Sequence, residues 1–326
     1  MKEGVVSFQN ILEASKKIRN FVTRTPTYLS VVFSRRTGAE VYLKLESFQP
    51  IGVFKIRGAV NKIRSLSPSE IKRGLVTVSS GNHGLAVAYT AKTYGTKAVV
   101  VVPEGAVKDK VKAIESHGAE VVKYGKDYDE AYSKAVEIQK KTRAIFVHPF
   151  NDPFVIAGQG TIGLELLEDF PDLDTVIVPI GGGGLISGIA IAAKTLKPDI
   201  RIVGVQAEGA PSMYRSWKAG KIVEIDSINT VADGLALRKP LDLTFRIIRR
   251  YVDDILLVTD QEIDEAVLAL LREAHILAEP SGAASLAALL FRYHPKPEEK
   301  VAVIVSGANI SIDYLASLLK KTQSFH

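Results

Sequence analysis

Three loop segments of the chain combine glycine with side chains that can bind or react. The first reads SSGNHG at positions 79–84 and stands between an apolar run and a helical pattern that starts near Leu85. Free N–H groups at the start of a helix attract anions, and serine and asparagine side chains add further donors. A plain helix cap needs only one such residue. We therefore predict a ligand site over Ser79, Ser80, Gly81, Asn82 and His83.

The second segment is a run of four glycines, positions 181–184, followed by Leu185 and a helical pattern rich in small residues. Four consecutive glycines lose much backbone entropy on folding, so a plain turn would not need them. A cup of backbone N–H groups around a phosphate does need them. Neither G-x-G-x-x-G nor G-x-x-x-x-G-K-[ST] can be read here, so a small phosphate ester is favoured over a dinucleotide.

The third segment holds a lysine, Lys55, between Phe54 and Ile56 in a stretch that contains Pro50 and Gly52. Burial lowers the pKa of an amine and makes it nucleophilic, which Schiff-base chemistry requires. Taken alone, a lysine near the start of a helix is more often a surface residue with a buried stem. Both interpretations stay open at this point.

Strand-like and helix-like patterns alternate through most of the chain and must position these segments. Short apolar runs lie at 75–79, 97–102, 120–123, 144–148, 175–179, 201–206, 254–258 and 301–305, and helical patterns at 108–116, 127–140, 162–169, 260–275 and 281–293. Nearly all-apolar strands separated by helices predict parallel sheets covered on both faces, the doubly wound α/β class. Ligands bind such sheets at the carboxyl ends of the strands, where loops follow strands.

Together, the motifs resemble one family, the fold-type II pyridoxal-phosphate enzymes of the serine/threonine dehydratase and serine racemase group. The resemblance extends from about Ala14 to Asp313 and rests on LKLE-x-x-Q-P-x-G-x-F-K-I-R-G-A, SSGNHG, H-P-F-x-D, GQGTI, GGGGL, ADG and EPSGA. It implies two doubly wound domains with mainly parallel sheets. Residues 1–73 and 152–326 would form a large domain that binds pyridoxal phosphate, and residues 74–151 a small domain.

The resemblance also implies a role for each site residue. Lys55 would form the Schiff base with the cofactor and then act as the base at the substrate α carbon. Phe54 would pack on the pyridine ring, Asn82 would hydrogen-bond the ring hydroxyl, and residues 79–83 would hold the substrate carboxylate. Ser306 would face the pyridine nitrogen. The phosphate would be bound by the backbone N–H groups of Gly181, Gly182, Gly183, Gly184 and Leu185.

We accordingly predict an L-threonine/L-serine ammonia-lyase that forms a 2-oxo acid and ammonia by β-elimination. A neutral serine at 306 does not keep the ring nitrogen protonated, which favours expulsion of a β hydroxyl. Ser80 resembles the second acid/base of the racemases, so the alternative is a serine racemase, or a dehydratase of another β-hydroxy amino acid such as 3-hydroxyaspartate. Val53 and Ala308 depart from the serine and glycine usual at these positions, and bear on substrate identity.

Four further residues have two interpretations each. His83 is as suited to fixing its loop as to titrating near the substrate, whereas His148 is more readily structural. Glu279 resembles a family residue near the cofactor but could simply start a helix. Glu208 matches a carboxylate that binds a divalent cation, Mg or Ca, in some relatives. The racemases have an aspartate six residues later, where this chain has Tyr214.

Composition limits the remaining possibilities. The chain has 326 residues, 46% of them hydrophobic and 24% charged, and no cysteine, which excludes disulfides and thiolate chemistry. No apolar run reaches the roughly 20 residues that span a bilayer, and no signal peptide is recognisable, so we expect a cytoplasmic protein. The net charge of +6 comes from scattered basic residues, which argues against nucleic acid. A small amino-acid substrate is expected, and the family predicts a homodimer or higher homo-oligomer.

Overall fold

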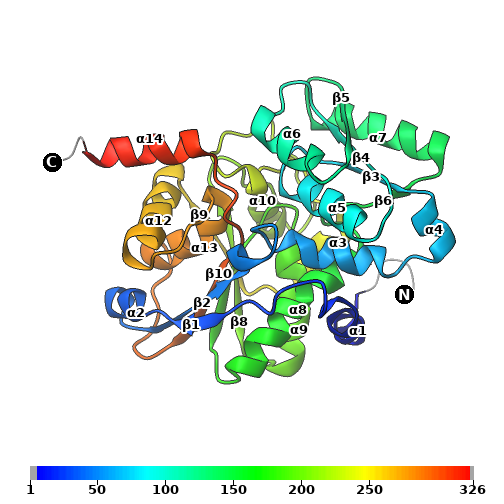
Figure 1. The fold of residues 1–326 in the computed structure, drawn as a ribbon. Helices are drawn as coiled ribbons and strands as arrows, with labels where there is room; N and C mark the ends of the chain where they lie inside the picture. Colours follow the sequence, from blue (N-terminus) through cyan, green and yellow to red (C-terminus); the bar gives the residue numbers. More distant parts are fainter. Residues whose placement is uncertain (1–5, 324–326) are drawn as a thin grey trace.

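The computed structural model describes residues 6–323, and its strands form two separate sheets (Figure 1). The smaller sheet has the order β5 (Glu120–Lys123), β4 (Ala98–Val102), β3 (Leu75–Val78) and β6 (Ile145–Phe146), and every neighbouring pair is parallel. Three longer helices follow its strands, and a short one precedes β3. These are α4 (Pro68–Lys72), α5 (Asn82–Thr93), α6 (Lys108–Glu115) and α7 (Tyr128–Thr142).

The larger sheet takes its strands from both ends of the chain. Its order is β1 (Thr27–Leu29), β2 (Glu40–Leu45), β10 (Lys300–Val305), β7 (Thr175–Pro179), β8 (Arg201–Ala207) and β9 (Asp254–Val258). Only the pairing of β1 with β2 is antiparallel, and the others are parallel. The last strand, β10, therefore lies between strands made from the first and the middle parts of the chain.

Helices cover both faces of the larger sheet, as its alternating side chains require. On β10, Val301, Val303 and Val305 pack into one apolar cluster, and Ala302 and Ile304 pack into another. The first cluster includes α2 (Val31–Thr37), α12 (Asp260–Glu273) and α13 (Pro280–Phe291); the second includes α8 (Pro153–Asp169), α9 (Gly184–Leu196) and α11 (Asp242–Tyr251). The predicted doubly wound α/β architecture is confirmed. The remaining helices are α1 (Phe8–Ile18), α3 (Lys55–Ile63), α10 (Ser212–Ala219), α14 (Ile312–Gln323), and the 3₁₀ turns η1 (Glu46–Phe48) and η2 (Asp233–Leu235).

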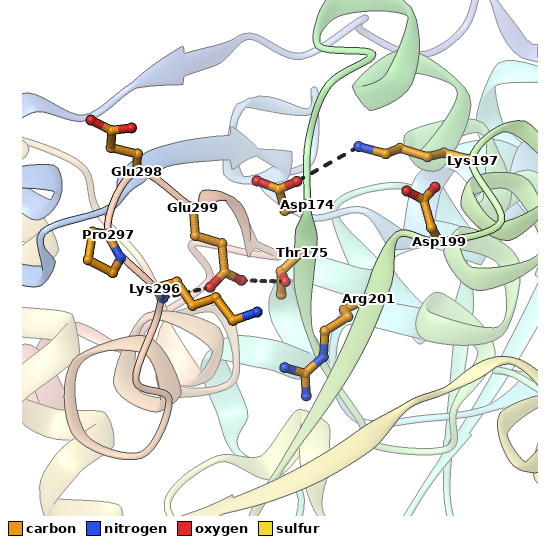
Figure 2. A pocket seen from close by; sticks show the side chains of 9 residues that line it. All are labelled: Asp174, Thr175, Lys197, Asp199, Arg201, Lys296, Pro297, Glu298 and Glu299. Carbon is orange, nitrogen blue, oxygen red and sulfur yellow. Dashed lines mark hydrogen bonds and ion pairs between the residues drawn. The ribbon is translucent and has the colours of Figure 1, made fainter.

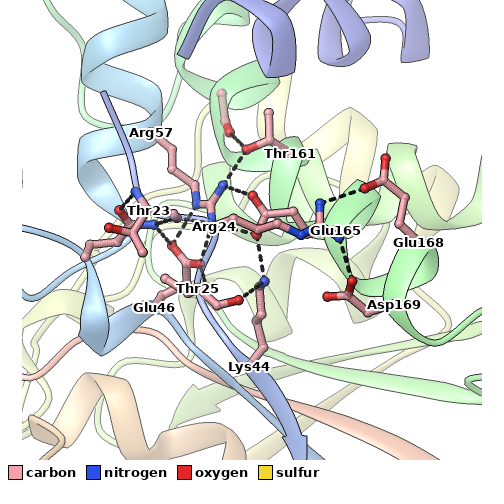
Figure 3. A network of polar contacts seen from close by, with 12 residues as sticks. Thr23, Arg24, Thr25, Lys44, Glu46, Arg57, Thr161, Glu165, Glu168 and Asp169 are labelled. Carbon is pink, nitrogen blue, oxygen red and sulfur yellow. Dashed lines mark hydrogen bonds and ion pairs between the residues drawn. The ribbon is translucent and has the colours of Figure 1, made fainter. Parts of the chain in front are cut away.

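A buried ion-pair cluster holds the first turn of α3 (Figure 3). Arg57 Nε donates to Glu46 Oε2 at 2.8 Å, and Arg57 Nη1 donates to Glu165 Oε1 at 2.6 Å. Lys44 Nζ donates to Glu165 Oε2 at 2.6 Å. These four side chains carry balanced charges and are almost entirely buried. α3 also lies close on α8, because a Cβ added at Gly158 would stand 2.5 Å from the Arg57 carbonyl oxygen.

The structure differs from the sequence expectation mainly around α8 and the first two strands. α8 begins at Pro153, nine residues before the predicted start, because Asp152 caps it by accepting from the backbone N–H groups of Phe154 and Val155. The glycines of α8 allow it to pack closely against α3 and α9. β1 and β2 were absent from the predicted strands. Among residues 6–323, no helix is both long enough and apolar enough to cross a membrane.

Candidate active site

The predicted loops meet at one place, the carboxyl edges of the parallel strands. The glycine run follows β7, the serine-rich loop follows β3, and Ser306 follows β10. β7 and β10 present their carboxyl ends at one edge of the larger sheet. The loop after β3, in the smaller sheet, is joined to this edge by hydrogen bonds of Asn82 with Glu279 and Asn309. Figure 1 shows the smaller sheet at the upper right and the larger sheet below and to its left.

Lys55 is the first residue of α3, and its amine lies among protein atoms. The Nζ atom donates to the Pro149 carbonyl at 3.2 Å and lies 5.1 Å from the centroid of the Phe54 ring. Burial lowers the pKa of Lys55 to about 8, and the Glu279 carboxylate acts in the opposite direction. The amine is therefore neutral more often than an ordinary lysine amine, and the neutral form is the nucleophile.

Gly181 and Gly182 pack too tightly for a side chain, and the glycine run leaves its N–H groups free. A Cβ added at Gly181 would stand 2.2 Å from the Gly234 carbonyl oxygen, and one at Gly182 would stand 2.2 Å from the Phe150 ring. Gly183 has a φ of +87°, which disfavours other residues. Within the described part of the chain, the backbone N–H groups of residues 181–186 donate to no acceptor. Such a set of donors at the start of α9 can bind an anion.

A chain of side-chain hydrogen bonds links the two sheets beside Lys55. Asn82, the first residue of α5, donates from Nδ2 to Glu279 Oε1 at 2.6 Å. Asn309 donates from Nδ2 to Asn82 Oδ1 at 2.7 Å and to the Ile51 carbonyl at 3.1 Å. Glu279 is 4% exposed, and burial together with the charge of Asp233 raises its pKa to about 7.

The segment that leads into Lys55 pairs with the loop that follows β10. Phe54 N donates to the Ser306 carbonyl at 3.1 Å, and Val53 and Gly307 form an antiparallel bridge. Ser306 itself is buried, and its Oγ lies 3.4 Å from the Ser281 carbonyl, a long contact that is easily exchanged for another. Lys55 and Ser306 are thus held on paired strands of backbone although they lie near opposite ends of the chain.

Two histidines near Lys55 are held neutral by their surroundings. His83 Nε2 lies 2.9 Å from the Val147 carbonyl, which can only accept, so Nε2 carries the proton. Burial and the charge of Lys55 lower the pKa of His83 to about 3. His148 Nδ1 accepts from the backbone N–H of Asn151 at 2.9 Å, and burial lowers the pKa of His148 to about 4. This geometry favours loop fixation for His83 and a structural part for His148.

The family model described as pyridoxal-phosphate dependent enzyme matches residues 18–307 of the chain. The chain belongs to this family. Its fold, its loops and the convergence around Lys55 agree with the resemblance first seen in the motifs. The family assignment and the expected α/β fold are thereby confirmed.

Curated relatives and solved structures narrow the comparison within the pyridoxal-phosphate dependent enzymes. The chain is 46% identical over 317 residues to the L-threonine ammonia-lyase of Thermotoga maritima. This alignment covers 97% of this chain and 79% of that protein. The chain is 41% identical to the catabolic L-threonine dehydratase of Escherichia coli, with 96% of each chain covered. The structure of maize serine racemase superimposes with a TM-score of 0.92 at 39% identity, covering 98% of this chain and 99% of that one.

The described residues fit the cofactor that gives this pyridoxal-phosphate dependent family its name. The free N–H groups of the glycine run suit a phosphate, which the cofactor carries. The lowered pKa of Lys55 suits reaction with the cofactor aldehyde. His83 Nδ1 is a buried acceptor without a partner within the described range, so it can accept a hydrogen bond from a bound group. The fit thus rests on three independent features of this structure.

Glu208 is the one predicted site residue that this convergence leaves out. It lies about half-exposed and pairs with Arg292, whose Nη2 is 3.3 Å from Glu208 Oε1. No group of three or more His, Cys, Asp or Glu side chains suited to a metal occurs in residues 6–323. A cavity of about 340 Å³ lies elsewhere, at the amino ends of β7 and β8, lined by side chains of both charges (Figure 2). It is unconnected with the predicted residues, since they follow the opposite ends of the strands.

Three contributors to the site were not singled out from the sequence. The Pro149 carbonyl contacts the Lys55 amine, the Phe150 ring supports the glycine run, and Asn309 joins two of the site segments. A backbone carbonyl leaves no trace in residue type. Asn309 stands in the SGAN motif three residues after Ser306, so its place after a strand was a usable signal.

Proposed function

We propose that this pyridoxal-phosphate dependent lyase is an L-threonine/L-serine ammonia-lyase. The observation that carries the proposal is the Lys55 amine, with a pKa near 8, at the same strand edge as the free N–H groups of the glycine run. An amine and an anion cradle at one edge suit a phosphorylated aldehyde and an amino acid. The substrate class is supported by the threonine ammonia-lyase and dehydratase relatives, to which the chain is 40–46% identical.

In this proposal each site residue has one task. The N–H groups of Gly181, Gly182, Gly183, Gly184 and Leu185 bind the phosphate, and Phe54 and Asn82 contact the ring. Residues 79–83 bind the substrate carboxylate through backbone and side-chain donors. When bound, the cofactor supplies an electron sink for the negative charge that develops at the substrate α carbon. Lys55 Nζ takes the α proton, which a neutral amine can do near pH 8.

Ser306 influences which bond breaks next. A hydroxyl does not hold a ring nitrogen protonated as a buried carboxylate would, so negative charge at the α carbon is less dispersed. Departure of the β hydroxyl relieves that charge, and the released enamine hydrolyses to a 2-oxo acid and ammonia. Ser306 is buried and its own hydroxyl carries no charge, which supports elimination over reactions that need a long-lived carbanion.

A serine racemase is the second candidate, and Ser80 is the observation that favours it. Racemisation needs a proton donor on the face of the α carbon opposite Lys55, and Ser80 lies on the loop between β3 and α5, on a different element from Lys55. The likeness to maize serine racemase supports this candidate as well. We expect elimination to dominate, because a serine hydroxyl is a weak acid unless its surroundings tune it.

The two candidates are separated by measuring 2-oxo acid release across L- and D-serine, L- and D-threonine and 3-hydroxyaspartate. The ammonia-lyase proposal expects rapid release from L-threonine and L-serine. Chiral chromatography of the remaining serine measures racemisation in the same samples. Racemisation faster than elimination would replace the primary proposal with the racemase, and release from 3-hydroxyaspartate alone would change the substrate.

Three finer expectations complete the proposal. We expect a homodimer or higher homo-oligomer and a cytoplasmic location. We retain a divalent cation at Glu208 only as a prediction, since the pairing of this carboxylate with Arg292 offers it a different partner. Light scattering and elemental analysis of the purified protein test the first and the third.

A further inference from the structure

The hydrogen-bond chain beside Lys55 has a fixed direction. Asn309 Nδ2 faces the Ile51 carbonyl at 3.1 Å, and a carbonyl can only accept, so the nitrogen must stand on that side of the Asn309 amide. The same nitrogen faces Asn82, which therefore presents its oxygen, at 2.7 Å. The Asn82 nitrogen is then left to face Glu279 Oε1, at 2.6 Å. A backbone carbonyl at one end thus sets the orientation of two amides.

One of the two N–H groups of the Asn82 amide consequently has no acceptor among the described residues. One of its two amide hydrogens is used by Glu279, and Nδ2 has no second acceptor among residues 6–323. With the opposite orientation, the Asn82 oxygen would point to Glu279 and its nitrogen to Asn309. The side of the amide next to Glu279 would then offer an acceptor instead of a donor. Which atom Asn82 offers therefore depends on Asn309.

Backbone contacts hold the loop directly before Asn309. Ala308 N donates to the Gly52 carbonyl at 2.8 Å, and Val53 bridges Gly307. Gly52 has a φ of +70°, and a Cβ added there would stand 2.8 Å from Asn309 Oδ1. The asparagine therefore fits a close approach between its own loop and the segment that leads into Lys55.

We propose that Asn309 is a positioning residue that sets the Asn82 amide so that it offers an N–H donor, and not an oxygen, to the bound cofactor. This inference rests on the proposed function, in which Asn82 contacts the ring of pyridoxal phosphate. The oxygen of the ring hydroxyl is the acceptor that such a donor would meet. Asn309 does not touch the reacting atoms and acts only through Asn82.

The test is the isosteric variant Asn309→Asp, which replaces the donor by an acceptor. The carboxylate introduced by this substitution would face the Asn82 oxygen as a like group, so the Asn82 amide turns over to donate to it. We expect the dissociation constant of pyridoxal phosphate to rise about 10–100-fold, the usual effect of losing one hydrogen bond to a charged group. The constant is measured by equilibrium dialysis of the holoenzyme against a series of cofactor concentrations, without any activity assay.

A second variant, Asn309→Ala, separates orientation from mere support. It deletes the side chain and both of its hydrogen bonds, and it leaves Glu279 as the side chain that can still orient the Asn82 amide. The inference predicts that alanine weakens cofactor binding less than aspartate does, although it removes more atoms. If Asn309 only supported the loop, alanine would weaken cofactor binding more than aspartate does. If Asn309→Asp does not fold, a cofactor constant for Asn309→Ala within twofold of the wild-type value would overturn the inference.

The outcomes for the inference and for the proposed function can be told apart. A wild-type protein that binds pyridoxal phosphate but releases no 2-oxo acid contradicts the proposed reaction only, because the dialysis still compares the variants. A wild-type protein that binds no pyridoxal phosphate contradicts both. Equal cofactor affinity in all three proteins contradicts the positioning by Asn309 alone.

Discussion

Glu46 and Glu279 are both almost fully buried, yet their surroundings differ in kind. Glu46 accepts from Arg57 and Thr25 within the ion-pair cluster, so its pKa is lowered even though burial alone would raise it (Figure 3). Glu279 accepts one hydrogen bond from the neutral Asn82 amide, and burial raises its pKa to about 7. A buried carboxylate that accepts enough hydrogen bonds stays ionised and fixes the backbone around it. A buried carboxylate that accepts too few has a raised pKa and can gain or lose a proton near neutral pH.

The ion-pair cluster of Glu46 and the hydrogen-bonded pair of Glu279 and Asn82 act on different parts of Lys55. The first holds α3, whose first residue is Lys55, against β2 and α8. The second faces the Lys55 amine and acts on its charge. The molecule thus separates the fixing of the lysine backbone from the tuning of the lysine amine, and each can be disturbed alone.

The largest effect is expected from Arg57→Met, which leaves two buried carboxylates without their guanidinium partner. We expect the free energy of unfolding to fall by about 3–5 kcal/mol, as for other buried pairs that lose one member. The measurement is denaturation in urea. Arg24→Met is the matched control: its pairs with Glu168 and Asp169 are half-exposed, so it should lose under about 1 kcal/mol. Equal losses in both variants would mean that burial of the cluster adds nothing.

The next effect concerns stability against pH in protein freed of cofactor. Because the pKa of Glu279 is raised in the folded state, its contribution to stability is present below its ordinary pKa of 4.5 and is lost as pH rises through about 7. A shift of this size corresponds to about 3 kcal/mol. Glu279→Gln should therefore gain stability relative to wild type between pH 5 and 8. Glu46 has a lowered pKa and therefore contributes no change in stability over that interval. A difference in unfolding free energy between Glu279→Gln and wild type that stays constant with pH would refute the prediction.

A smaller effect is expected on capture of the cofactor. Lys55 reacts as the neutral amine, so the rate at which cofactor-free protein binds pyridoxal phosphate should rise with pH and level off above about 8. Glu279→Gln should lower the pH at which the rate is half its maximum, because the Glu279 carboxylate raises the pKa of Lys55. Stopped-flow absorption gives the rates, and borohydride reduction with mass spectrometry should locate the pyridoxyl group on Lys55. A rate that still climbs at pH 10, or a label on another lysine, would contradict the assignment.

The smallest effect on the main reaction is expected from Ser80→Ala. If Ser80 is the second acid/base, the variant should lose exchange between L- and D-serine and any action on D-serine. Elimination from L-threonine should stay within about an order of magnitude, because it needs only Lys55 as base. Chiral chromatography and 2-oxo acid release are measured on both proteins. Retained exchange in the variant would assign the second proton to another group.

The sequence predicted the architecture and the converging loops because both follow local rules. Apolar runs marked the parallel strands, and glycine-rich stretches after strands marked the loops of the site. The start of α8 was missed because Gly158 and Gly160 weaken the helical pattern there, and only their close packing on α3, α1 and α9 explains them. β1 escaped because three residues at a sheet edge carry little pattern.

The polar partners were harder to predict than the loops. The Arg57 cluster joins residues more than 100 positions apart, and no spacing rule links Glu165 to Lys44. The contact of Pro149 with Lys55 uses a carbonyl that every residue possesses. Asn82 was predicted as a site residue, but its dependence on Asn309 follows only from the tertiary fold. Long-range pairing therefore decides what residue type alone leaves open.

The place of β10 in the larger sheet governs the order in which this protein can mature. β10 lies between β2 and β7, so the antiparallel pair of β1 and β2 has no further neighbour in the sheet until residues 300–305 are made. The backbone that carries Lys55 pairs with residues 306–308, which follow that strand. On the ribosome Lys55 is made well before residues 306–308, since synthesis runs from the N-terminus. The nascent chain therefore cannot assemble its reactive centre before residues 306–308 have emerged from the ribosome.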